Sequence, residues 1–294
     1  MDAPNPSASP TFANRTPLRI GAVGLKARDL NRLTAFYRDA IGLSVLDRGA
    51  KHARLGAGGV TLLELEHTPD AKPDDPRSAG LFHTAFLQPT RGDLARWLVH
   101  AARNRVPLTG ASDHAVSEAI YLDDPEGNGI EVYRDRLPEE WRWKGDRIHM
   151  TTERLDLDNL AADAGAAAYA RAPDGLRVGH IHLRVGDLDA AQRFYSGTVG
   201  LDVTAGRHGA LFMSSGRYHH HVGTNIWQSA GATPREDDRA GLSWFSVEAA
   251  DRTGLEAVIA RLDGTKVPSD RPGGGVEVRD PWGTRVRFVP ASPY

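Results

Sequence analysis

Short segments of alternating apolar and polar residues recur along the chain, each followed by a stretch with helical periodicity. Residues 20–45, IGAVGLKARDLNRLTAFYRDAIGLSV, align without a gap to residues 178–203, VGHIHLRVGDLDAAQRFYSGTVGLDV, and nine positions are identical. In both copies an alternating strand leads to an Asp-Leu pair that starts a helix, and a Gly-Leu pair ends the helix before the next strand. The chain therefore contains an internal repeat that begins as strand, helix, strand.

A second pair of similar segments follows these copies. Residues 80–89, GLFHTAFLQP, resemble residues 241–250, GLSWFSVEAA, and the two units end alike, with DDPEGNGIEVY from residue 123 and RDPWGTRVRFV from residue 279. The chain thus divides into four modules of about 50 residues, numbered one to four in chain order. Each module is predicted to form a strand, a helix and then two or three strands.

One such module has too few strands to close a hydrophobic core, so the modules must pair. Two paired curved sheets leave a concave surface between them. The predicted fold is therefore α+β, with four βαβββ modules paired into two open barrels of mixed β-sheet with flanking helices. Residues 1–17 are predicted to be a flexible tail, and residues 18–136 a first domain of modules one and two. Residues 137–176 are predicted to be a linker, and residues 177–294 a second domain of modules three and four.

The linker has two distinct parts. LDNLAADAGAAAYA, residues 157–170, is rich in alanine and is expected to form a short helix. EEWRWKGDRIHM, residues 139–150, is expected to be an extended connector. Neither part has a counterpart elsewhere in the repeat.

Composition excludes several classes of protein. The 294 residues carry a formal net charge of -2 and contain no cysteine. Disulfides, thiolate catalysis and cysteine metal sites are excluded, so any metal must be held by histidine and carboxylate. The chain has no long basic run and no apolar run of about 20 residues, which argues against nucleic acid and membrane as partners. Residues 1–17 lack the apolar segment of a signal peptide, so a cytoplasmic protein is expected.

Equivalent positions of a repeat face the same way in every copy, which makes polar residues at such positions informative. At the third position of the opening strand, modules one to four have Ala22, His83, His180 and Trp244. At the matching position of the last strand they have a residue near Glu64, then Glu131, Asn225 and Arg287. Two imidazoles and one well-placed carboxylate therefore come from modules two and three.

His83, His180 and Glu131 make up the 2-His-1-carboxylate set that suits Fe(II) with open coordination positions, and Mn(II) could occupy the same site. A single strand histidine is more often structural, but the repeat places these two at equivalent positions. His182 lies two residues after His180 and corresponds to Gly24, so it is expected to be structural or to support the ligands.

A histidine run and a turn motif complete the candidates. RYHHHVGTNIW is interpreted as part of a strand, on which neighbouring side chains alternate, so at most two of His219, His220 and His221 face the cavity. The Asp-Pro-Glu-Gly-Asn segment at 124–128 is interpreted as turn chemistry, with glycine supplying a positive φ. No catalytic role is expected for it.

The module pattern resembles the vicinal oxygen chelate superfamily of glyoxalases, bleomycin resistance proteins and dioxygenases over residues 18–290. The stretch HAVSEAIYLDDPEGNGIEVY more specifically resembles type I extradiol ring-cleaving dioxygenases of the catechol 2,3-dioxygenase group. In that group a histidine is followed by an apolar-Tyr pair, Asp-Pro-x-Gly and the metal-binding glutamate. These elements correspond here to His114, Tyr121, residues 124–127 and Glu131.

The resemblance implies a role for each candidate residue. The two histidines and the glutamate of modules two and three would be the Fe(II) ligands. His114 and Tyr121 correspond to the pair that forms hydrogen bonds to the substrate and its intermediates. His220 best resembles the acid/base histidine, with His219 and His221 as alternatives in register.

The position of the ligands departs from the family pattern. In the enzymes that the chain resembles, all three ligands come from the last two modules, whereas here they come from modules two and three. The active barrel is therefore expected to pair modules two and three, with modules one and four in a metal-free barrel. In the alternative arrangement, module one pairs with module two and module three pairs with module four. That arrangement would separate His180 from His83 and Glu131.

The implied function is an extradiol dioxygenase that opens catechol or a substituted catechol, with a small aromatic diol and O2 as partners. Relatives are often oligomers, so a homo-oligomer is expected. Two alternatives stay open. A glyoxalase-like isomerase or lyase would want a second carboxylate where Asn225 stands, and a metal-free small-molecule binding protein would need no ligand set.

Overall fold

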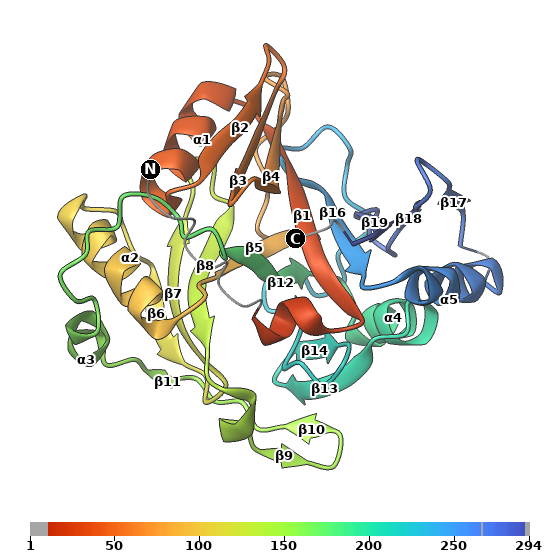
Figure 1. Ribbon diagram of the computed structural model, residues 1–294. Coiled ribbons are helices and arrows are strands. Elements are labelled where there is room, and N and C mark those ends of the chain that lie inside the picture. The colour runs from red at the N-terminus through yellow and green to blue at the C-terminus, as the bar shows by residue number, and fades with distance from the viewer. Residues whose placement is uncertain (1–10, 266, 292–294) are drawn as a thin grey trace.

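A computed structural model describes residues 11–265 and 267–291. The chain forms an α+β fold of two mixed β-sheets, one of them curled into a half-barrel, with helices packed against them (Figure 1). Each module runs strand, helix and three strands, as the repeat predicts. Among the described residues, no helix is long and apolar enough to cross a bilayer.

Modules two and three share one sheet, and modules one and four share the other. In spatial order the first sheet contains β11 (Glu153–Arg154), β6 (Gly110–Asp113), β7 (Ser117–Asp123), β8 (Gly129–Asp135), β5 (Gly80–Leu87), β12 (Arg177–Arg184), β15 (Val222–Asn225), β14 (Ala210–Ser214) and β13 (Asp202–Arg207). The second contains β17 (Ser269–Asp270), β18 (Val276–Arg279), β19 (Arg285–Pro290), β16 (Gly241–Ala249), β1 (Leu18–Ala27), β4 (Val60–His67), β3 (His52–Ala57) and β2 (Ser44–Arg48). The predicted pairing of modules two and three is therefore confirmed, and the alternative pairing is wrong.

The two sheets have equivalent central junctions, formed by the antiparallel pairs β5 with β12 and β1 with β16. His83 lies opposite His182 in the first junction, and Trp244 lies opposite Gly24 in the second. Glycine is required in the second, because a Cβ there would lie 2.2 Å from the indole Nε1 of Trp244. An indole thus fills the space in one sheet where the other has imidazoles.

A helix follows each opening strand, and those of modules one and three begin at the predicted Asp-Leu pairs. The helices of the chain are α1 (Leu30–Phe36), α2 (Arg91–Arg103), α3 (Leu157–Ala162), α4 (Leu188–Gln192) and α5 (Arg252–Asp263), the π-helical segments η2 (Tyr37–Ile41) and η4 (Arg193–Thr198), and the 3-10 helices η1 (Phe12–Arg15) and η3 (Pro138–Glu140). The aspartate of each repeated Asp-Leu pair is an N-cap. Asp29 accepts a hydrogen bond from a backbone N–H in the first turn of α1 at 2.9 Å, and Asp187 does so in α4 at 2.6 Å. Such a cap is worth about 1 kcal/mol.

Each π segment places a buried tyrosine against the Asp-Pro-x-Gly turn of the following module. Tyr37 donates a hydrogen bond to Asp124 at 3.0 Å, and Tyr195 donates one to Asp280 at 2.9 Å. Backbone N–H groups of the turns bind the other oxygen of each carboxylate, so the turn chemistry predicted for 124–128 is confirmed. These bonds connect module one to two and module three to four.

The Asp280→Asn variant is expected to lose part of the pH dependence of stability. Burial raises the pKa of Asp280 to about 6, despite the hydrogen bonds from Tyr195 and the turn, whereas the unfolded value is about 3.9. The folded chain then binds more protons between about pH 4 and 6, so its unfolding free energy falls as pH rises through that window. The unfolding free energy of the wild-type chain should fall by roughly 2 kcal/mol over this window, and the variant should lack this fall because asparagine does not titrate. Urea unfolding at several pH values measures it, and parallel profiles for the two chains would contradict the assignment.

Most of the core is one cluster that contains apolar residues of all four modules, among them Leu25, Phe86, Ile181 and Phe245. A smaller cluster packs Ala13 of η1 against Tyr133, Trp141 and Tyr218. The smaller cluster therefore joins the N-terminal segment and the linker to the sheet of modules two and three.

The N-terminal segment and the linker have more structure than predicted. Residues 1–10 of the predicted flexible tail lie outside the described residues, but η1 packs Phe12 edge-on against Trp141, with ring centroids 5.5 Å apart. The expected extended connector instead folds into a hairpin of β9 (Trp143–Lys144) and β10 (Arg147–Ile148). Aromatic side chains of the two segments pack against each other. The prediction treated each segment alone and so did not include this contact.

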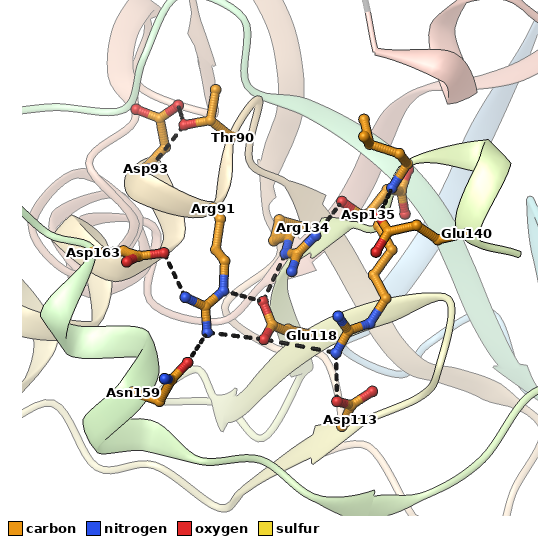
Figure 2. A network of polar contacts seen from close by, with 12 residues as sticks. Thr90, Arg91, Asp93, Asp113, Glu118, Arg134, Asp135, Glu140, Asn159 and Asp163 are labelled. Carbon is orange, nitrogen blue, oxygen red and sulfur yellow. Dashed lines mark hydrogen bonds and ion pairs between the residues drawn. The ribbon is translucent and has the colours of Figure 1, made fainter.

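A buried carboxylate ties the linker to the sheet (Figure 2). Glu118 on β7 accepts hydrogen bonds from Arg91 at the start of α2 at 2.9 Å and from Arg134 on β8 at 2.6 Å. Arg91 also binds Asn159 of α3 at 2.8 Å and Asp163 just beyond it. Because Glu118 is 4 % exposed, its charge depends on these partners. The network fixes α3 against α2 and the outer edge of the sheet.

Candidate metal centre

Three buried side chains converge at the centre of the nine-stranded sheet, on the adjacent strands β8, β5 and β12. The Nε2 of His83 lies 3.0 Å from Oε2 of Glu131, and the Nε2 of His180 lies 3.3 Å from the same oxygen. The two Nε2 atoms are 3.3 Å apart. All three residues are at least nine-tenths buried. The structure therefore brings together the three residues predicted as ligands, called the ligand cluster below.

Glu131 and His180 are in the protonation states that bind cations. Burial raises the pKa of Glu131, but the imidazoles of His180 and His83 outweigh burial and hold that pKa well below its usual range. Burial lowers the pKa of His180 to about 4, although the Glu131 charge acts in the opposite direction. At neutral pH the pair is therefore a carboxylate and a neutral imidazole, the forms in which both residues ligate metals.

The spacing of the ligand cluster also fits one metal ion. Two donors about 2.1 Å from an ion and at right angles to each other lie about 3 Å apart, close to the distances observed here. Among the described residues this is the one group of three or more His, Cys, Asp or Glu side chains with metal-ligand spacing. Two nitrogen donors and one oxygen donor suit a divalent transition metal.

A cavity of about 360 Å³ opens beside the ligand cluster. Its polar lining includes His83, Glu131, His114, Tyr121 and His220. Much of the remaining lining is aromatic or aliphatic, from Phe82, Leu122, Ile130, Met150, Phe212 and Trp227. The cavity can therefore hold a flat apolar molecule whose polar groups point at the ligand cluster.

His114 and Tyr121 form a hydrogen-bonded pair in the cavity wall. The Tyr121 hydroxyl lies 2.7 Å from Nε2 of His114, and Nδ1 of His114 lies 2.7 Å from the backbone carbonyl oxygen of Thr151. A carbonyl can only accept, so Nδ1 of His114 donates to Thr151, and Nε2 of His114 shares the second hydrogen bond with the Tyr121 hydroxyl. Burial and the Glu131 charge raise the pKa of Tyr121 well above its usual value, so the hydroxyl stays protonated.

The three consecutive histidines precede β15 and do not lie on a strand, which corrects the predicted placement. All three are buried, yet they face different surroundings. His220 lines the cavity, and its ring centroid is 4.1 Å from that of His180. His219 lies behind it, with Nδ1 2.8 Å from Nδ1 of His220. His221 binds the hydroxyl of Thr16 at 3.2 Å.

His182 lies outside the ligand cluster. Its Nε2 is 3.1 Å from the side-chain nitrogen of Asn225, and burial lowers the pKa of His182 well below its usual value, so the neutral ring accepts from the amide. Its ring packs against His83 at 5.0 Å. In the other sheet the equivalent surroundings are Trp244 with the Arg287 guanidinium 4.0 Å from its ring centroid.

Several residues of the site were not identified from the sequence. Met150 and Thr152 line the cavity from the linker, and Arg207 of β13 lines it while donating a hydrogen bond to Thr152. None of them belongs to a repeated pattern. Asp135 binds His219 at 2.7 Å. It could have been identified from the sequence, because it lies four residues after Glu131 and therefore on the same face of β8.

Sequence comparison finds relatives over most of the chain. The pattern of the Glyoxalase/Bleomycin resistance protein/Dioxygenase superfamily matches residues 19–132 and 177–288. The chain is 38% identical over 276 residues to the catechol-2,3-dioxygenase of Bacillus subtilis (strain 168), which covers 92% of this chain and 96% of that protein. It is 27% identical over 166 residues to the biphenyl-2,3-diol 1,2-dioxygenase 3 of Rhodococcus globerulus, covering 52% and 81%.

Solved structures share the fold at lower identity. The crystal structure of glyoxalase I from Zea mays has a TM-score of 0.58 and 15% identity, covering 95% of this chain and 94% of that one. The cppA protein from Streptococcus pneumoniae TIGR4 has a TM-score of 0.57 and 12% identity, covering 94% and 99%. These likenesses concern the fold alone.

Proposed function

Because the chain belongs to the glyoxalase/bleomycin resistance protein/dioxygenase superfamily and is a homologue of catechol-2,3-dioxygenase over most of its length, we propose that it is an extradiol dioxygenase. In the proposed reaction O2 opens the ring of catechol, or of a substituted catechol, beside the two hydroxyl groups. The observation that supports this most is the convergence of His83, Glu131 and His180 next to a largely apolar cavity.

The proposed metal is Fe(II), which 2-His-1-carboxylate sites bind with coordination positions left open, and Mn(II) suits the same donors. His83, His180 and Glu131 would hold it. When bound, the ion supplies Lewis acidity and a path for electrons from the diol to O2. The surrounding apolar side chains exclude water, which strengthens every electrostatic interaction inside the cavity.

The remaining polar residues position the substrate and its protons. Burial lowers the pKa of His220 well below its usual value, so the imidazole is neutral and can accept a proton. In the proposed reaction it takes a proton from a diol hydroxyl as general base and returns one later as general acid. Tyr121 and His114 orient the reacting oxygens and stabilise charge on them through hydrogen bonds.

The two alternatives have less support. A glyoxalase-like isomerase would want a second carboxylate in module three, but Asn225 stands there and binds His182. A metal-free binding protein would have no need for an ionised carboxylate enclosed by two imidazoles, because burying such a charge is unfavourable without a cation or other compensation.

Anaerobic reconstitution with Fe(II), followed by catechol and then air, tests the proposal. Wild type is expected to form the yellow product 2-hydroxymuconate semialdehyde with one O2 consumed per catechol, and His180→Ala is expected to form none. Parallel samples with Mn(II) and without metal identify the active ion. No colour with catechol, alkyl catechols or chlorocatechols despite bound iron would reject the dioxygenase. Isomerisation of a hemithioacetal by the same sample would then favour the glyoxalase-like reaction.

A further inference from the structure

Three buried side chains form a hydrogen-bonded series that leads away from the cavity behind His220. The Nδ1 of His220 is 2.8 Å from Nδ1 of His219, and Nε2 of His219 is 2.7 Å from Oδ1 of Asp135. Asp135 ends β8, on the same face as Glu131. The side chain of His219 is 0% exposed and that of Asp135 is 11% exposed. The series therefore connects the cavity to the end of the strand that provides the carboxylate of the ligand cluster.

The donors and acceptors in this series decide where His220 has its proton. An ionised carboxylate only accepts, so Nε2 of His219 has a proton. We take His219 as neutral, so that its Nδ1 is bare and accepts the hydrogen bond that Nδ1 of His220 donates. The Nε2 of a neutral His220 is left with a lone pair. It is the nitrogen that remains available to a molecule in the cavity that His220 lines.

Aromatic rings hold the middle member of the series in place. The ring of His219 stacks on Tyr218 with centroids 4.0 Å apart and meets the edge of Trp141 at 5.3 Å. The Tyr218 hydroxyl binds the same oxygen of Asp135 at 3.2 Å. His219 therefore cannot rotate or exchange its nitrogens without breaking contacts on both sides.

Asp135 differs from a carboxylate of this fold whose role is structural. Both oxygens of Asp124 accept hydrogen bonds, from its own turn and from Tyr37. The Oδ2 of Asp135 is buried with no hydrogen-bond partner among the described residues. A buried carboxylate that served only to hold a loop would be expected to use both oxygens. The difference points to a role for Asp135 in its contact with His219.

We propose that Asp135 and His219 are positioning residues that keep the proton of His220 on Nδ1 and its lone pair at Nε2 directed to the substrate diol. This inference deepens the proposed function and rests on it. When the diol O–H bond breaks, the proton forms an N–H bond at Nε2 of His220 and the electron pair stays on the diol oxygen. The resulting imidazolium is held through its Nδ1–H by His219, which in turn donates to the Asp135 carboxylate.

Asp135→Asn is the discriminating variant, because the new amide can donate to Nε2 of His219. That donation would reverse both tautomers and put the proton of His220 on Nε2. An Asp→Asn change that places a catalytic imidazole in the wrong tautomer lowers turnover by up to about 10⁴-fold. We expect kcat for catechol to fall by about 10²- to 10⁴-fold. Bound Fe(II) should stay within about threefold of wild type, because neither Asp135 nor His219 belongs to the ligand cluster.

The ¹⁵N NMR spectrum of histidine-labelled, metal-free protein gives a second readout that does not depend on activity. His220 is expected to have its proton on Nδ1 in wild type and on Nε2 in Asp135→Asn. Asp135→Glu, which keeps the charge, should restore the wild-type tautomer and part of kcat. Asp124→Asn is the matched control, since it replaces another buried aspartate and should lower stability while leaving kcat and the His220 tautomer unchanged.

The inference is overturned by a wild-type His220 with its proton on Nε2, or by an Asp135→Asn enzyme with wild-type kcat. If Asp135→Asn does not fold, the wild-type spectrum and the Asp135→Glu variant still decide between the two tautomers. If wild type opens no catechol, the proposed function fails. The NMR measurement would still show whether Asp135 and His219 set the tautomer.

Discussion

Glu131→Gln is expected to bind Fe(II) more than about 100-fold more weakly than the wild-type chain and to open no catechol. Changes outside the ligand shell of a metal site already cost 10- to 100-fold in affinity, so the loss of a ligand should exceed that range. Glu131 is also the one anionic member of the ligand cluster. Its amide replacement would donate a hydrogen to an imidazole 3.0 or 3.3 Å away and occupy a lone pair that the metal needs.

The measurement is the iron content after anaerobic reconstitution and gel filtration, together with competition against a chelator of known affinity. Glu64→Gln is the matched control, because Glu64 lies on β4, the corresponding last strand of module one in the other sheet, and no histidine cluster is found there among the described residues. The control should retain wild-type iron and activity. Stoichiometric iron in a folded Glu131→Gln chain would show that the ligand set is wrong.

Glu118→Gln is expected to lower the free energy of unfolding by about 3–5 kcal/mol, the range measured when one partner of a buried ion pair is removed. Arg91 and Arg134 lie 2.9 and 2.6 Å from Oε2 of Glu118 (Figure 2). In the variant both guanidinium groups would face a neutral amide. Burial raises the pKa of Glu118, but these two arginines outweigh burial and hold the pKa below its usual range. The stabilisation is therefore present above about pH 4.3, the unfolded value, and is lost as pH falls below it.

Urea unfolding at pH 7 and at pH 3.5 tests this expectation. The two chains should differ clearly at pH 7 and by less at pH 3.5, because the carboxylate of the unfolded wild-type chain is largely protonated at that pH. Glu256→Gln is a suitable control, because Glu256 forms an exposed pair with Arg252 at 2.7 Å and should change stability far less. An effect of Glu118→Gln no larger than the control would show that the network of Figure 2 does not stabilise the fold.

The internal repeat made the ligand cluster predictable. His83 and His180 occupy equivalent positions of two opening strands, and Glu131 occupies a defined position of a last strand. A side-chain period of two fixes which face each of them takes, so convergence requires only that modules two and three share a sheet. The observed junction of β5 with β12 meets that requirement.

The histidine run and the linker were less predictable, because contacts between distant residues determine them. Gly216 and Arg217 adopt positive φ values of 65° and 61°, which turn the chain before it reaches β15 and remove the strand alternation assumed for the run. His221 is then held by Thr16, more than 200 positions earlier. A local sequence pattern does not predict contacts between such distant residues. The linker hairpin likewise depends on packing against segments outside the repeated modules.

Two sets of contacts join the modules in different combinations. Sheet hydrogen bonds connect module two to module three and module one to module four. The buried Tyr-Asp bonds connect module one to module two and module three to module four. His83 and Glu131 lie before the linker and His180 lies after it. On the ribosome, the nascent chain thus emerges with two donors long before the third. Binding of the proposed metal would have to wait until synthesis has passed the midpoint, and a prematurely terminated chain would lack one of its three ligands.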